Sequence, residues 1–175
     1  MALKDVLKTA SPEVLNEILR EAESRLAAQL TTAIAADARA MTFLGFVATL
    51  AVASLGASLA VVASNGWLAC IGIVVGGAFT AAGMFAFEAA KPIDFQAPGN
   101  DPSLWEADIL ASISAHNAIA EQTAHYDEML KENRAAMEAS ARSLTVAAEI
   151  TRWTVVGGAV ASACYLAAKH FAFIV

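Results

Sequence analysis

The chain has 175 residues, 58% of them hydrophobic, and a formal net charge of −6. The hydrophobic fraction exceeds the roughly 45–50% that is usual in soluble proteins. The basic residues are scattered singly, which argues against a nucleic-acid partner, because such partners are bound by clustered lysines and arginines.

The N-terminal region, residues 1–40, is predicted to be an amphipathic helix. Ser11, Pro12 and Glu13 form a helix start, with a capping serine, a proline at the first helical position and an acid in the first turn. Apolar side chains then recur at spacings of three and four. Because no helix breaker precedes Met41, we expect the helix to continue unbroken into the next segment.

Residues 41–90 predict a transmembrane helical hairpin. The runs 41–64 and 67–87 contain no charged residue, and each reaches the about 20 residues that a helix needs to cross a bilayer. The dipeptide Asn65-Gly66 between them suits a positive φ and a tight reversal.

The two cysteines, Cys70 and Cys164, lie inside apolar runs far apart in the sequence. We expect them to be small buried hydrophobic residues rather than a disulfide or redox pair.

Residues 91–103 form a connector with three of the four prolines of the chain, and residues 104–152 form a helical segment rich in Ala, Glu, Leu and Met. A straight helix from Leu104 to the next apolar run would be about 70 Å long. The connector reaches about 45 Å at most. We therefore expect the helix to tilt strongly or to break around 112–117, where serine, histidine and asparagine are weak helix formers.

Asn133 lies on the apolar seam of this helical segment, which has the three-four spacing of a coiled coil. It could fix the register of the seam as a buried polar residue. Alternatively, and in our interpretation more simply, it lies at the edge of the seam and is partly solvated.

Residues 153–175 are predicted to form a third transmembrane helix. The run is apolar for about three-quarters of a span, until Lys169 and His170 interrupt it. A lysine close to a helix end reaches the interface with its long side chain. The alternative is a C-terminal helix that lies in the membrane interface.

The distribution of basic residues predicts the orientation. With the exception of Lys169, all lysines and arginines lie on one side of the hairpin, and its turn carries no charge. The positive-inside rule then places the N-terminus and residues 91–152 in the cytoplasm, with the spans in a bacterial inner membrane. The expected fold is an all-α integral membrane protein with three transmembrane helices and a cytoplasmic helical stalk.

Three sets of residues are expected to act at the membrane. Small residues at spacings of four suit close helix packing, although in an alanine-rich chain they could also be a weak enrichment. Charged residues at the span ends suit interfacial anchoring or local ion pairing, or a junction that transmits motion of the cytoplasmic helices to the hairpin. The small set is Gly72, Gly76, Gly77, Gly157 and Ala161; the charged set is Asp37, Arg39, Glu88, Lys91 and Arg152; the expected interfacial tryptophans are Trp67, Trp105 and Trp153.

Catalytic chemistry is not expected. The sequence has no glycine-rich phosphate loop, CxxC, HExxH or nucleophile elbow. Glu121, His125 and Glu128 share one helix face and could supply part of a metal site, but the sequence offers no second set of ligands. We predict a non-enzymatic protein without a metal or cofactor.

A resemblance bears on function. The stretch AADARAMTFLGFVATL, residues 35–50, resembles the first-span region of bacterial antiphage transmembrane effectors, the Pycsar-type effector domain and the related SLATT-like membrane modules. Ala36, Asp37, Arg39 and Ala40 match their short motif. The resemblance implies an amphipathic helix, an apolar hairpin and a long helix that returns to the membrane. It also implies oligomerisation and permeabilisation of the inner membrane after a nucleotide signal.

The leading hypothesis is therefore an oligomeric membrane effector or pore of a bacterial defence system. Its expected partners are the lipid bilayer, further copies of the chain, and a soluble cytoplasmic protein or nucleotide-signal sensor. The 175 residues contain no segment that resembles a sensor domain, which leaves the trigger open. The alternatives are a membrane scaffold whose cytoplasmic helices dock a soluble partner, and a small channel or transporter subunit.

Overall fold

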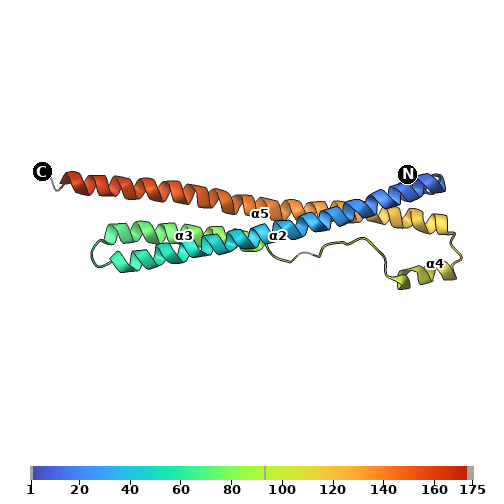
Figure 1. Ribbon diagram of the computed structural model, residues 1–175, viewed down its shortest axis with the longest axis horizontal. Coiled ribbons are helices and arrows are strands. Elements are labelled where there is room, and N and C mark those ends of the chain that lie inside the picture. The colour runs from blue at the N-terminus through green and yellow to red at the C-terminus, as the bar shows by residue number, and fades with distance from the viewer. Residues whose placement is uncertain (1, 93, 173–175) are drawn as a thin grey trace. The chain divides into compact units, whose positions relative to one another are not determined.

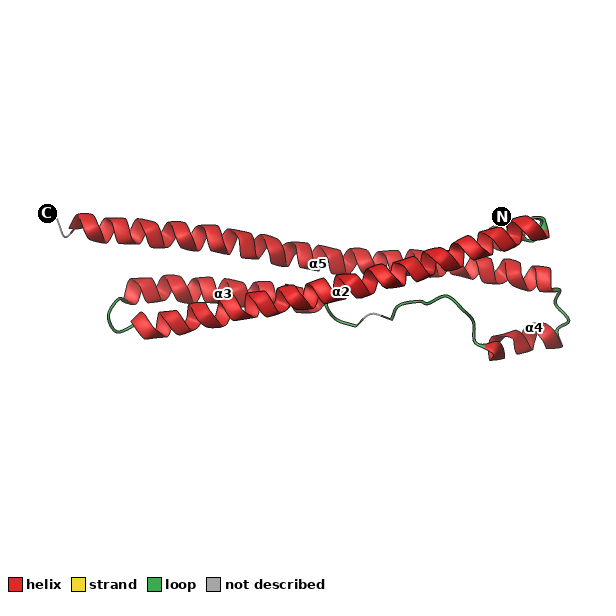
Figure 2. Ribbon diagram, viewed as in Figure 1, coloured by secondary structure: helices red, strands yellow, loops and turns green. Residues whose placement is uncertain are grey.

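The computed structural model describes residues 2–92 and 94–172, and all regular structure in these ranges is helical (Figure 2). The expected all-α class is confirmed. The elements are α1 (Leu3–Leu7), α2 (Pro12–Val61), α3 (Gly66–Ala89), the 3-10 helix η1 (Pro102–Trp105), α4 (Glu106–Leu110) and α5 (Ala115–Ala172) (Figure 1). The chain divides into two compact units: unit 1, residues 1–35 and 92–138, and unit 2, residues 36–91 and 139–175.

Helix α2 starts where the sequence predicts and runs without a break for 50 residues. At its start Val14 N–H donates to Ser11 Oγ at 3.4 Å, and Leu15 N–H donates to the Ser11 carbonyl at 2.9 Å. The first bond satisfies an amide group that has no partner inside the helix, and the second is the first bond of the helix itself. The expected continuous helix from the amphipathic segment into the apolar run is confirmed.

Unit 1 is held together by apolar contacts between its helices. One cluster contains Leu7, Leu15 and Ala120, and a second contains Leu26, Tyr126 and Met129. The first half of α2 supplies Leu15 and Leu26, and the first part of α5 supplies Ala120, Tyr126 and Met129. The amphipathic face that the sequence shows from Leu15 onward is therefore a packing face, as its period indicates.

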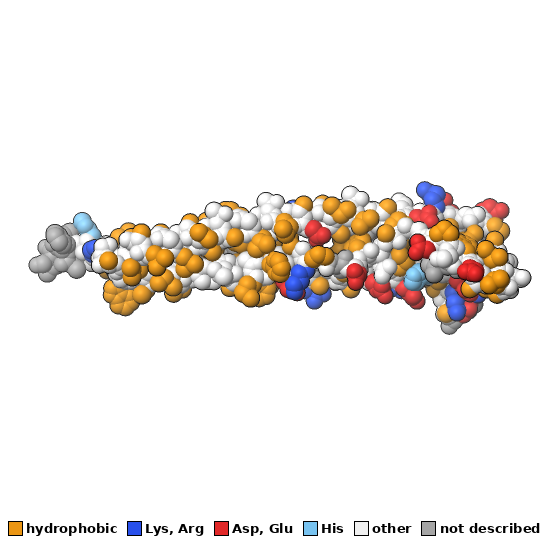
Figure 3. All heavy atoms as spheres, turned by 90° about the horizontal axis from the view of Figure 1, so that it is seen from below, with side chains coloured by type: hydrophobic (Ala, Val, Ile, Leu, Met, Phe, Trp, Pro, Cys, Tyr) orange, Lys and Arg blue, Asp and Glu red, His pale blue; other side chains and the backbone are white. Residues whose placement is uncertain are grey.

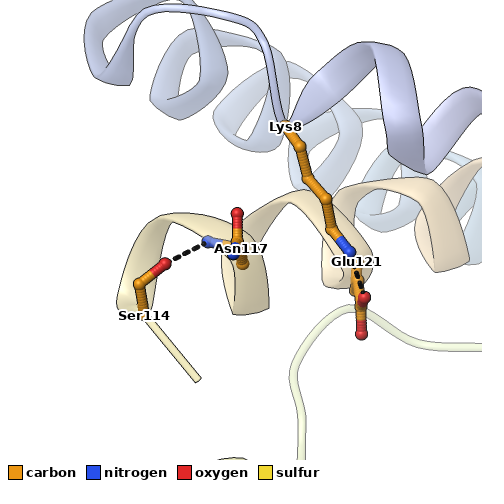
Figure 4. Close-up of polar contacts among 4 residues, drawn as sticks. All are labelled: Lys8, Ser114, Asn117 and Glu121. Atoms are coloured by element: carbon orange, nitrogen blue, oxygen red, sulfur yellow. Dashed lines mark hydrogen bonds and ion pairs between the residues drawn. The ribbon is translucent and has the colours of Figure 1, made fainter. Parts of the chain in front are cut away.

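The expected break between residues 112 and 117 is present. Helix α4 ends at Leu110, Ser112 adopts a left-handed φ of 53°, and α5 begins at Ala115. Ser114 caps the new helix, because its Oγ accepts a hydrogen bond from Asn117 N–H at 3.3 Å (Figure 4).

The reversal between α2 and α3 differs from the prediction. Asn65 has an extended φ of −153°, and its Oδ1 accepts a hydrogen bond from Leu68 N–H at 3.2 Å. In the described residues, positive φ values occur only at Gly99 and Ser112. The expected positive φ at Asn65-Gly66 is wrong because Asn65 is the N-cap of α3, a position that requires extended backbone, and the chain reverses over residues 62–65 instead.

In unit 2, α2 and α3 are each long and apolar enough to cross a membrane. Only 17% of the apolar window of α2 and 28% of that of α3 is buried, whereas the core helix of a soluble protein is mostly buried. Hydrophobic side chains accordingly cover much of the face shown in Figure 3. Among the described residues α5 does not meet the same criterion, and residues 173–175 of the expected third span lie outside them.

Cys70 and Cys164 are free and exposed, so the expected burial is wrong. Both lie on helices of unit 2, whose apolar surface is largely uncovered by other parts of the chain. An apolar run that faces outward does not bury its small residues.

Candidate functional site

The contact between α2 and α3 depends on two glycines of the predicted packing set. A Cβ atom on Gly72 would lie 2.1 Å from Ser58 Oγ, and one on Gly76 would lie 2.7 Å from Leu55 Cγ. Both distances are shorter than van der Waals contact. These positions therefore let the two helices of the hairpin approach closely, as small residues do in membrane helices.

The contact between α3 and α5 uses a glycine that the sequence analysis missed. A Cβ atom on Gly158 would lie 2.8 Å from Val75 Cγ2. The four-residue spacing predicts its neighbour Gly157 as the packing position. A Cβ atom on Gly157, however, would have no other atom within 4 Å. The Gly157-Gly158 pair in the sequence indicates a close helix contact, but helical periodicity alone does not say which of the two glycines faces α3.

The remaining small residues of the set face outward. A Cβ atom on Gly77 would have no other atom within 4 Å, and Ala161 is exposed. Only Gly72 and Gly76 of the predicted set therefore pack within the chain. Gly77, Gly157 and Ala161 remain available on the surface of unit 2.

A hydrogen bond joins α5 to the turn of the hairpin. Tyr165 Oη donates to Asn65 Oδ1 at 2.7 Å, and the same oxygen accepts the capping bond from Leu68 N–H. Together with the contact at Gly158, this bond keeps α5 beside α3 as far as the turn. The third apolar segment thus accompanies the hairpin rather than leaving it.

The charged residues expected at the span ends form local ion pairs. Lys91 Nζ lies 2.5 Å from Glu88 Oε2, and Arg152 lies 2.7 Å from Glu149 Oε2. The Arg152 guanidinium also lies over the ring of Trp153, 5.1 Å from its centroid. These pairs are partly exposed, so each contributes little to stability.

The other predicted junction and anchor residues lie in different surroundings. Asp37 is half-buried and Arg39 is exposed, both on α2 within unit 2. Trp67 and Trp153 are exposed on unit 2, as an interfacial anchor requires, whereas Trp105 is half-buried in unit 1.

In unit 1 the connector is bound to α5 by side chains that contact its backbone. We call residues 94–101 the strap. Gln96 N–H donates to Asn133 Oδ1 at 2.9 Å, and Asn133 Nδ2 donates to the Gln96 carbonyl at 2.9 Å. Gly99 N–H, at a positive φ of 112°, donates to Tyr126 Oη at 3.0 Å. The strap has no ladder or helix of its own, so its backbone groups are paired by the buried side chains of Asn133 and Tyr126.

Asn133 is 1% exposed, so our preferred interpretation of a partly solvated edge residue is wrong. Both ends of its amide are used by the strap. A buried amide is tolerated only when its donors and acceptor are paired, and the backbone of Gln96 supplies a donor and an acceptor together.

The acidic face of α5 is a surface ion-pair region. Lys8 Nζ lies 2.6 Å from Glu121 Oε1 (Figure 4), and this hydrogen bond and charge lower the pKa of Glu121. His125 Nδ1 lies 3.8 Å from Glu128 Oε2 on the exposed surface. Among the described residues, no three histidine, cysteine or acidic side chains come together as metal ligands.

Comparison with known proteins adds no relative: no family model matches this chain, and neither the curated proteins nor the solved structures yield a match. The resemblance of residues 35–50 to antiphage effectors therefore stays a prediction.

Proposed function

We propose that this chain is a non-enzymatic protein of the bacterial inner membrane that assembles into an oligomeric membrane effector or pore of a defence system. In this proposal unit 2 forms three transmembrane helices, and unit 1 is the cytoplasmic stalk. The hydrogen bond between Tyr165 and Asn65 carries the argument, because it keeps α5 beside the apolar hairpin as far as its turn. If the hairpin crosses a bilayer, α5 crosses with it.

The surface of unit 2 supports insertion. Large apolar side chains on all three helices are exposed, among them Val52, Val74 and Val160. The threonines there bond to their own helices, as Thr49 Oγ1 does to the Gly45 carbonyl at 2.9 Å. Hydroxyl groups satisfied in this way can face hydrocarbon without leaving polar atoms unpaired.

Self-assembly is supported by the small residues that face outward. Gly77 and Ala161 would allow a helix of a second copy to approach closely, which is how helices associate in lipid. Orientation follows from the basic residues, which flank the hairpin on the side away from its turn.

A soluble protein or a nucleotide-signal sensor would act on unit 1, whose strap links the end of α3 to α4 and α5. The resemblance to Pycsar-type and SLATT-like effectors favours a signal that triggers permeabilisation.

The test is membrane potential in bacteria that express the chain from an inducible promoter, followed with a potential-sensitive dye. Loss of potential on induction is expected for the effector. Gly77→Leu should weaken that loss together with oligomer size in detergent, whereas Gly56→Leu, an open position on α2, should leave both unchanged.

The alternatives give different results in the same cells. An intact potential combined with capture of one soluble protein by unit 1 would support the scaffold and contradict the effector. A flux restricted to one solute, without general depolarisation, would support a channel or transporter subunit.

A further inference from the structure

A groove runs between α3 and α5 on the surface of unit 2. Its volume is about 630 Å³, which lies in the range of roughly 300–1,000 Å³ typical of ligand sites. Val74, Val75 and Ala78 line it from α3, and Val146, Ile150 and Trp153 line it from α5.

The Gly157-Gly158 pair forms part of the groove. Gly158 brings the two helices together at Val75, whereas Gly157 leaves open space where a side chain would project. One glycine therefore fixes the distance between the helices, and the other keeps the groove free. A bulky side chain at 157 would project into the groove.

Glu149 also lines the groove, and its partner Arg152 extends beside Trp153. The carboxylate and the guanidinium lie 2.7 Å apart, and their side chains are 49% and 61% exposed. The groove thus combines apolar walls with a carboxylate in its lining and a guanidinium beside it, and both charged groups remain accessible.

We propose that this groove binds a phospholipid with an ethanolamine headgroup. An acyl chain lies along the valines and the glycine pair, the phosphate contacts Arg152, and the ammonium group donates to Glu149. The headgroup carries a negative phosphate next to a positive ammonium group. The phosphate therefore complements the positive Arg152, and the ammonium group complements the negative Glu149. Arginine binds phosphate through its planar set of N–H donors, and hydrogen bonds between charged groups are the strong ones.

The charge pair also selects against other headgroups. The glycerol headgroup of an anionic phospholipid supplies no cation for Glu149, and a choline headgroup has no N–H to donate. Another groove of unit 2, of about 440 Å³, is lined by no charged residue, and its Ser58 and Thr154 hydroxyls donate to their own helices. That groove offers no charged group that would distinguish headgroups.

This inference rests on the proposed insertion of unit 2 into a bilayer. Native mass spectrometry of the full chain in detergent, with phosphatidylethanolamine, phosphatidylglycerol or phosphatidylcholine added in turn, tests it. We expect tighter retention of phosphatidylethanolamine by about tenfold, the effect of one charged hydrogen bond. Glu149→Gln should abolish this preference, and Arg152→Gln should weaken retention of all three lipids.

Gly157→Leu should remove the bound lipid by blocking the groove, whereas Ala163→Leu, at an exposed position further along α5 and outside the groove, should retain it. Equal retention of the three lipids, or unchanged retention in Gly157→Leu, would overturn the proposal. A smaller oligomer in Gly157→Leu with unchanged lipid would instead assign the groove to a second copy.

Extraction of membranes with alkaline carbonate distinguishes a failure of the proposed membrane insertion from a failure of the lipid site. A chain that washes out of the membrane contradicts the proposed insertion, and the lipid site with it. A chain that stays in the membrane but shows no headgroup preference contradicts the lipid site alone.

Discussion

Asn133 and Gln96, 37 residues apart in the sequence, exchange two hydrogen bonds of 2.9 Å each. The side chain of one residue on α5 thereby holds the backbone of the strap. Because Asn133 is buried, its loss leaves both a cavity and two unpaired strap groups.

We expect Asn133→Ala to destabilise unit 1 by about 1–3 kcal/mol, because each of the two lost hydrogen bonds contributes about 0.5–1.5 kcal/mol. Hydrogen exchange of the full chain should show faster exchange at Gln96 and Gly99. Asn100→Ala is the control, because its bond to Gln122 Oε1 at 2.8 Å lies on the exposed surface and its loss should cost less. Equal protection of the strap in wild type and Asn133→Ala would contradict this role.

The close contact at Gly72 yields a second prediction. Gly72→Ala places a Cβ atom against Ser58 Oγ and should destabilise the hairpin by about 1–3 kcal/mol, as overpacking does. Thermal unfolding in detergent measures the effect. Gly56→Ala, where the new methyl group meets open space, is the matched control. Adding Ser58→Ala to Gly72→Ala should recover part of the loss, and a loss that persists in full would point to another cause.

Much of the helix pattern could be predicted because it depends on local chemistry. The start of α2 at Ser11-Pro12, its continuation into the apolar run and the break before Ala115 follow from caps, breakers and weak helix formers. The limited reach of the connector also required a break or a tilt.

The burial and pairing of single residues could not be predicted in the same way. Asn133 finds its partner in an irregular segment, whose path no periodicity describes. Gly157 and Gly158 are equivalent in the sequence until the position of α3 is known. Cys70 and Cys164 show that an apolar run does not reveal whether a residue faces another helix or the surroundings.

The ion pair between Lys8 and Glu121 predicts a pH dependence. The pKa of Glu121 lies below its ordinary value of 4.5, because the lysine favours the carboxylate. Its contribution to the stability of unit 1 is present above that ordinary pKa and is lost as the pH falls through the lowered pKa of the folded state. Because the pair is partly exposed, the effect is small and should shrink with salt.

Glu121→Gln should therefore reduce the acid-side decline in stability, measured by unfolding at several pH values below 6. Glu132→Gln, at an exposed position of the same helix, is the control. An identical pH profile for the wild type and Glu121→Gln at low salt would show that the pair does not contribute.

The topology can be tested with single cysteines in a Cys70→Ala, Cys164→Ala background. Ser64→Cys, an exposed position in the turn between α2 and α3, should react in intact spheroplasts with a thiol reagent that does not cross membranes. Glu138→Cys should react only after the membrane is opened, because the positive-inside rule places residues 91–152 in the cytoplasm. The reverse labelling pattern would invert the orientation. Labelling of both positions in intact spheroplasts would contradict a hairpin that crosses the membrane, since the turn and residue 138 would then lie on the same side.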